Sequence, residues 1–99
     1  MALLQTTVEK DDIITIRTVQ GFEIVAKFVS ESASSIKVDK PLLVNGCTTV
    51  NETGVLKVLW GKLGETFSTL DKVEINSVNI LLAGATDETI ATQYTSQVS

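Results

Sequence analysis

Residues 13–44, IITIRTVQGFEIVAKFVSESASSIKVDKPLLV, predict three consecutive antiparallel strands joined by two tight turns. Residues 13–19 are rich in Ile, Thr and Val, whose branched side chains suit a pleated, half-buried surface. Gln20-Gly21 predicts a hairpin turn, because Gly adopts positive φ without a steric penalty. The polar run SESASS at 30–35 predicts the second turn.

The strand expected at residues 22–29 has two distinguishable faces, because successive side chains of a strand point to opposite sides. The face expected to point into the core carries Phe22, Ile24, Ala26 and Phe28. The opposite face includes Val25 and Val29, which a monomer explains less easily. We expect a subunit interface to cover these two valines.

A proline is expected to interrupt the third strand. Residues 35–39 predict a strand whose apolar side chains face inward. Pro41 has no N–H to donate, so it is expected to end this strand before residues 42–44 continue as a short extended piece. Residues 45–54 then predict a long loop, bounded by two glycines.

The second half of the chain predicts two more strands and an irregular connection. Residues 55–60, VLKVLW, are expected to form the fourth strand, followed by an irregular segment at 61–71. Residues 73–83 predict the last strand region. Its alternation slips at Asn76-Ser77, which indicates a bend or bulge there.

The period changes near the C-terminus and predicts a helix over residues 86–98. Ile90, Tyr94 and Val98 recur every four residues and form one helical stripe. Thr86 is the expected N-cap, because a Thr hydroxyl can accept a hydrogen bond from the first helical turn.

Length and charge limit the classes of protein that fit. Ninety-nine residues with 43% apolar content predict a single domain, residues 1–99, with a core small enough to gain stability from partner subunits. The net charge of −4 has the wrong sign for gripping nucleic acid over the whole surface, so such a site must be a local patch. We expect no signal peptide in residues 1–12 and no membrane segment.

The residue types that support most catalytic and metal sites are sparse. The chain has no His, and its carboxylates are scattered singly or lie at element boundaries. We therefore predict no catalytic residues, no metal ligands and no cofactor, and we predict that the protein is not an enzyme. The single Cys47 cannot form a disulfide within the chain, which favours a reducing cytoplasm.

Five short strands in antiparallel succession predict a mainly β protein, a strongly bent barrel over about residues 13–84 followed by the short helix. An SH3-like or Sm-like barrel and an OB-type barrel both fit this number of strands. The two short turns near residues 20 and 32 favour the simple meander that SH3-like and Sm-like barrels share.

A longer pattern resembles the first motif of the Sm family. Its positions are Ile14-x-Ile16, Gln20-Gly21, Ala26-x-Phe28 and Ile36-x-Val38. Gly21 matches the turn Gly of the family, and Ala26 stands where a second Gly is usual. Ser35 is nearest to the family's base-contacting Asn. Residues 75–81 resemble the second motif, with Asn76 and Ser77 in place of its Arg and Gly.

Within this superfamily the layout is similar to the small Sm-like proteins of marine cyanophages. The matching features are the hairpin at residues 20–23, Pro41, Leu59-Trp60 at the end of a strand, and an acidic helix start leading to Tyr94. This resemblance covers residues 13–94. It implies a phage origin and the cytoplasm of an infected host cell.

The resemblance also implies two sets of functional residues. A nucleic-acid surface is implied at two turns that meet on one ring face: Ser32, Ser34, Ser35, Lys37, Asn76, Ser77 and Asn79. A subunit interface is implied between the fourth strand of one copy and the fifth strand of the next: Val55, Leu56, Lys57, Val58, Leu59, Trp60, Val78, Ile80, Leu81 and Leu82.

Three functions follow as expectations. The first is a non-catalytic homo-oligomeric ring that binds single-stranded nucleic acid, RNA more than DNA, in RNA or DNA processing. The second is a phage structural or protein-interaction ring that binds no nucleic acid. The third is a monomeric SH3-like adaptor, although five aromatic residues are few for a peptide-binding groove.

Overall fold

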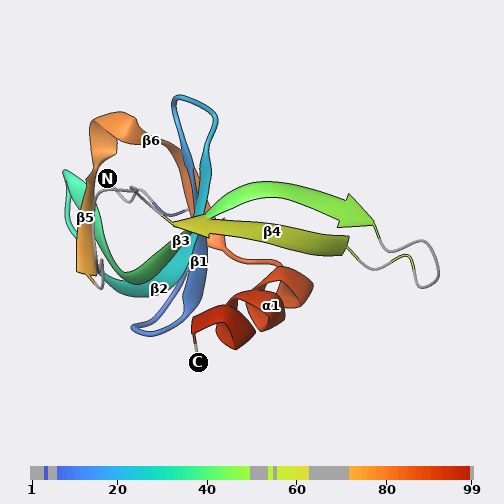
Figure 1. The fold of residues 1–99 in the computed structure, drawn as a ribbon. Helices are drawn as coiled ribbons and strands as arrows, with labels where there is room; N and C mark the ends of the chain where they lie inside the picture. Colours follow the sequence, from blue (N-terminus) through green and yellow to red (C-terminus); the bar gives the residue numbers. More distant parts are fainter. Residues whose placement is uncertain (1–3, 5–6, 50–53, 55, 63–71, 99) are drawn as a thin grey trace.

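Strands dominate the computed structural model, which describes residues 4, 7–49, 54, 56–62 and 72–98. In chain order, the elements are β1 (Ile13–Thr18), β2 (Glu23–Glu31), β3 (Ser35–Thr49), β4 (Leu56–Lys62), β5 (Lys72–Asn76), the 3₁₀ turn η1 (Ser77–Asn79), β6 (Ile80–Ala85) and α1 (Glu88–Val98). Figure 1 shows the strongly curled sheet, with α1 beneath β4 and with β5 and β6 at the other end.

The six strands of the described residues occupy five positions in the sheet, because two of them share one position. The order of the sheet is β4-β3-β2-β1-β6, and β5 pairs with β3. All pairings between these strands are antiparallel. Because β5 lies against residues 35–39 and β4 against residues 42–49, the two share one edge of β3 in succession. This curled sheet with a C-terminal helix confirms the predicted mainly β class and is consistent with a small Sm-like barrel.

Strand β3 bends at Lys40 and Pro41 but does not end there, so the predicted break is wrong. Lys40 has a φ of +50°, and the register between β3 and β2 shifts opposite this point. The pairing with β5 stops at Asp39 and the pairing with β4 begins at Leu42, so neither neighbour needs an N–H from Pro41. A proline is therefore tolerated inside a long strand.

The loop predicted over residues 45–54 is also wrong over its first half. Residues 45–49 belong to β3, and the register shifts between Val44 and Gly46, so a bulge accommodates Asn45. Thr48 and Thr49 are β-branched residues that suit a strand. Residues 50–53 lie outside the described part of the chain.

The core lies on the concave side of the sheet. It consists of Ile14, Ile16, Ile24, Ala26, Phe28, Ile36, Val38, Ile75 and Ala83. Phe22, expected in this core, is instead 54% exposed. The pairing of β1 with β2 ends at Glu23, so Phe22 lies beyond the last paired residue. It belongs to the turn, where its N–H donates a hydrogen bond to the Thr18 hydroxyl.

The convex side of the sheet is covered in part by α1. Val25 is 1% exposed and lines a small cavity with Val58 and Ile90, so the helix covers the valine that we expected at a subunit interface. Tyr94 is fully buried, its ring meets that of Trp60 at a centroid distance of 5.9 Å, and its hydroxyl donates to the Lys40 carbonyl. The predicted helical stripe is thus confirmed at its centre.

The helix cap differs from the prediction. Asp87, rather than Thr86, caps α1: its carboxylate accepts from Thr89 N at 3.1 Å, and its carbonyl accepts from Ala91 N at 2.8 Å. The Thr86 hydroxyl instead lies 2.8 Å from the Thr15 hydroxyl on β1. A cross-element hydrogen bond therefore occupies the group that was expected to cap the helix.

Replacing Tyr94 tests how α1 is anchored. Burial, with the nearby Asp39 carboxylate, raises the pKa of Tyr94 from 10.0 to about 12. The folded state therefore holds this proton more tightly than the unfolded state. The resulting stabilisation is complete below pH 10 and is lost between pH 10 and 12. We expect Tyr94→Phe to lower the free energy of unfolding by about 1 kcal/mol at pH 7, because one hydrogen bond is lost.

The stability difference between the two proteins should shrink as the pH rises above 9 and reverse by pH 11. By pH 11 the natural protein should have lost about 1.4 kcal/mol relative to Tyr94→Phe, which cannot ionise. Urea unfolding at pH 7, 9, 10 and 11 measures this difference directly. A constant difference across that range would contradict the anchoring role of the hydroxyl.

Candidate nucleic-acid interface and assembly edges

The turn between β2 and β3 is organised by the hydroxyl of Ser32. This oxygen accepts hydrogen bonds from Ser34 N at 3.3 Å and Ser35 N at 3.2 Å, and Ser32 N donates to Ser35 O at 2.9 Å. Ser residues favour turns because the hydroxyl satisfies backbone groups two or three positions away. Ser32 and the buried Ser35 therefore hold the turn, while Ser34 is exposed.

The second predicted turn lies directly against the first. Ser77 N, at the start of η1, donates to Ser34 O at 2.7 Å. Asn76 caps η1 by accepting from Val78 N at 3.2 Å through its side-chain oxygen, which leaves its amide NH₂ at the exposed surface. The structure thus brings together two turns that are more than forty residues apart in the sequence. We call residues 32–35 the serine turn, and its contact with η1 the polar junction.

Asn79 and Lys37 lie to either side of this junction. Asn79 O accepts from Val19 N at 3.0 Å, so this end of η1 lies against the turn between β1 and β2. Lys37 is exposed on β3 directly opposite Glu74 on β5, a residue of the opposite charge. The predicted nucleic-acid residues therefore form a polar surface with little excess positive charge.

Several apolar side chains on η1, on β6 and beside the turn between β1 and β2 are exposed. Val19, Phe22, Val78, Leu81 and Leu82 are each about half exposed or more, and Val78 reaches 75%. Val19 and Phe22 flank the turn between β1 and β2, while the other three lie on η1 and β6. The sequence offered one signal for this surface, the run of apolar residues from 80 to 83, but it gave no signal for Phe22.

The two strands predicted to pair between subunits are the two ends of the sheet. In the described residues, β4 pairs with β3 alone and β6 pairs with β1. Of the predicted interface residues, Leu59, Val78, Leu81 and Leu82 are 46%, 75%, 60% and 47% exposed.

The remaining predicted interface residues divide into three groups. Lys57 is exposed and Ile80 half-buried, as an edge contact requires. Val58 is buried, and half-buried Trp60 lies against Tyr94, so both face the helix. Val55 and the side chain of Leu56 lie outside what the structure describes.

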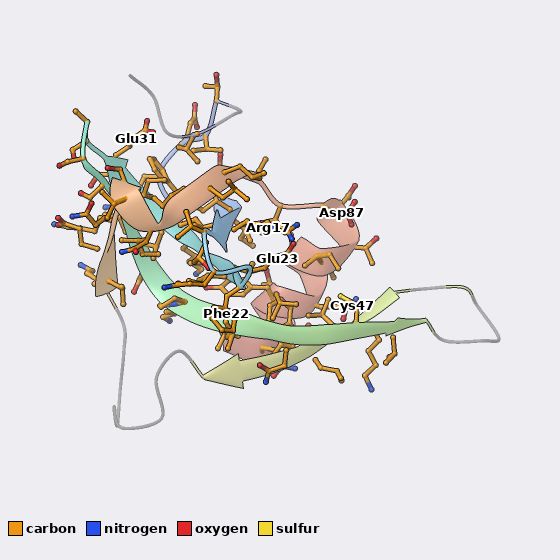
Figure 2. All side chains as sticks on the ribbon, turned by 90° about the horizontal axis from the view of Figure 1, so that it is seen from above. Arg17, Phe22, Glu23, Glu31, Cys47 and Asp87 are labelled. Atoms are coloured by element: carbon orange, nitrogen blue, oxygen red, sulfur yellow. The ribbon has the colours of Figure 1, made fainter. Side chains whose placement is uncertain are left out.

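The convex side holds a separate cavity of about 210 Å³ under the start of α1. Its lining includes aliphatic side chains from three strands and the polar residues Glu23, Cys47 and Asp87. Figure 2 shows Glu31, beside the serine turn, at the far end of the molecule from Cys47 and Asp87. The cavity and the polar junction are therefore distinct places on the protein.

The described part of the chain bears on two features, a metal site and a membrane-spanning helix. There, no three His, Cys, Asp or Glu side chains come close enough together to hold a metal ion. In the same residues, no helix has the length and apolar character needed to cross a bilayer.

No family model matches the chain, and no curated protein matches it in sequence. The mainly β fold is consistent with a small Sm-like barrel, and membership of the Sm family stays a prediction.

Serine substitutions test the assignment of roles within the turn. Ser32→Ala removes the acceptor for two backbone N–H groups and should lower the free energy of unfolding by about 1 kcal/mol. Ser34→Ala is the matched control, because the exposed Ser34 hydroxyl makes no hydrogen bond within the described residues, and it should change stability by less than about 0.5 kcal/mol. Chemical unfolding of both variants measures the difference. Equal effects would contradict the organising role of Ser32.

Proposed function

We propose that this protein forms a homo-oligomeric ring that binds single-stranded nucleic acid, RNA in preference to DNA, without catalysing a reaction. The observation that carries the proposal is the hydrogen bond from Ser77 N to Ser34 O, at 2.7 Å, which joins the two polar turns into one surface. The same two regions are those that the Sm-like resemblance assigns to RNA contacts.

The chemistry of this surface fits bases better than phosphates. Ser34, Asn76 and Asn79 are exposed, and their hydroxyl and amide groups can hydrogen-bond to base edges and to the ribose 2′-OH. Lys37 is the one positive charge among the proposed contacts, and Glu74 lies opposite it. A protein with a net charge of −4 should therefore bind weakly through each copy and gain affinity from several copies acting together.

The open edges of the sheet support assembly. Unpaired strand edges readily pair with another chain, and β4 and β6 are different surfaces of the same subunit. Pairing β4 of one copy with β6 of the next is a head-to-tail contact, which closes into a ring when the rotation allows it. Such a ring would place the serine turn and η1 of successive copies on one face.

RNA binding can be measured by fluorescence anisotropy with a labelled mixed-sequence single-stranded RNA at low salt. The variant Ser34→Ala/Asn79→Ala removes two exposed polar groups that make no side-chain hydrogen bond within the described residues. We expect a loss of affinity of about 5-fold or more, from about 1 kcal/mol of lost contacts. The control Gln97→Ala, exposed on α1, should bind like the natural protein. Equal affinities for the variant and the control would contradict this surface.

A ring that binds other proteins instead of nucleic acid is the second candidate. The exposed apolar side chains of Val78 on η1 and of Leu81 on β6 favour it, because exposed apolar clusters often mark protein contacts. An assembled protein that ignores both RNA and DNA at low salt would replace the first proposal by this one.

A further inference from the structure

A side chain from α1 closes the outer edge of β4 at one point. Gln93 Oε1 accepts a hydrogen bond from Val58 N at 2.9 Å. Val58 lies opposite Cys47 of β3, and successive residues of an antiparallel strand direct their backbone groups to alternate sides. Because the Val58 N–H bonds to the helix, it points away from β3 and out of the open edge. The N–H of Trp60, two residues further on, points to the same side.

The position of Gln93 is fixed by its neighbour. Tyr94 is fully buried, and its hydroxyl donates to the Lys40 carbonyl at the bend of β3. Its ring also lies against Trp60, two residues beyond Val58 on β4. The contact between Gln93 and the edge therefore depends on the same anchor that holds α1 on the sheet.

The other open edge is covered at one point as well. Leu4 forms a parallel bridge with Ala83 of β6, and Leu4 N donates to a carboxylate oxygen of Glu31 at 3.0 Å. Because Ala83 already pairs with Ile16 of β1, Leu4 lies on the opposite, outer side of β6. Residues near the two ends of the chain thus each occupy one of the edges that strand pairing requires.

We propose that Gln93 guards the edge of β4 and limits its pairing with the β6 edge of a second copy, so that the position of α1 controls assembly. The inference rests on the proposed ring. The second copy is the partner because its β6 edge carries the exposed Leu81 and Leu82, and β4 carries the exposed Leu59. A strand that pairs across Val58 must first displace the Gln93 amide. Covering an edge in this way is a known protection against strand addition.

Replacing Gln93 should strengthen self-association. Gln93→Ala removes the acceptor, so Val58 N becomes available to a neighbouring strand. The concentration at half-assembly should fall by about 2- to 10-fold, the equivalent of one net hydrogen bond. Gln93→Glu keeps an acceptor oxygen and should assemble no more readily than the natural protein. Gln97→Ala, exposed on the same helix, is the control and should match the natural protein.

Sedimentation velocity over a concentration series measures assembly. Amide hydrogen exchange at Val58 in the dissociated protein reports the contact itself, and it should be faster in Gln93→Ala than in Gln97→Ala. Circular dichroism establishes that each variant is folded. Equal half-assembly concentrations for Gln93→Ala and Gln97→Ala would overturn the guard, even where the natural protein forms rings and binds RNA.

The guard and the proposed ring fail in different ways. A natural protein that stays monomeric while Gln93→Ala assembles would support the guard and contradict a constitutive ring. Monomers for every variant at every concentration would overturn the guard, because no pairing would exist to limit. RNA binding, measured separately, would then decide whether the nucleic-acid surface of the proposed function stands by itself.

Discussion

The bend of β3 at Lys40 and Pro41 is the constraint on which the rest of the structure depends. On one side of the bend β3 pairs with β5, and on the other side it pairs with β4. The carbonyl of Lys40 accepts the Tyr94 hydroxyl, so the bend is also where α1 is attached. A straight β3 would open the curl of the sheet and leave Tyr94 without its partner.

This bend connects the architecture to the two proposed activities. The half of β3 that pairs with β5 carries the serine turn and brings it against η1, which forms the polar junction. The half that pairs with β4 presents a sheet edge, over which α1 places Gln93. One strand therefore fixes the proposed nucleic-acid surface at one end and the proposed assembly edge at the other.

Local patterns in the sequence predicted much of this fold. The alternation from residue 24 to residue 28 located the core face of β2, the Gln20-Gly21 pair located a hairpin turn, and the spacing of Ile90 and Tyr94 located the buried side of α1. Each of these signals depends on residues that lie close together in the sequence. The meeting of the serine turn with η1 was expected from the family resemblance.

Most of the errors involve contacts between distant residues, although the exposed Phe22 lies in a local turn with Thr18. Pro41 is compatible with a strand only because pairing passes from β5 to β4 at that place, which no local pattern shows. Val25 is buried by a helix that follows more than sixty residues later. The hydrogen bond from Val58 to Gln93 also joins distant segments. A Gln within a predicted surface helix does not by itself indicate such a contact.

In the proposed assembly, the edges of β4 and β6 join copies of the chain into a ring whose polar turns bind single-stranded RNA. Native mass spectrometry of the full chain with a short single-stranded RNA tests it most directly. We expect a species that contains several 10.6 kDa chains and bound RNA. A spectrum that contains only the single 10.6 kDa chain and free RNA, at protein concentrations up to tens of micromolar, would contradict it.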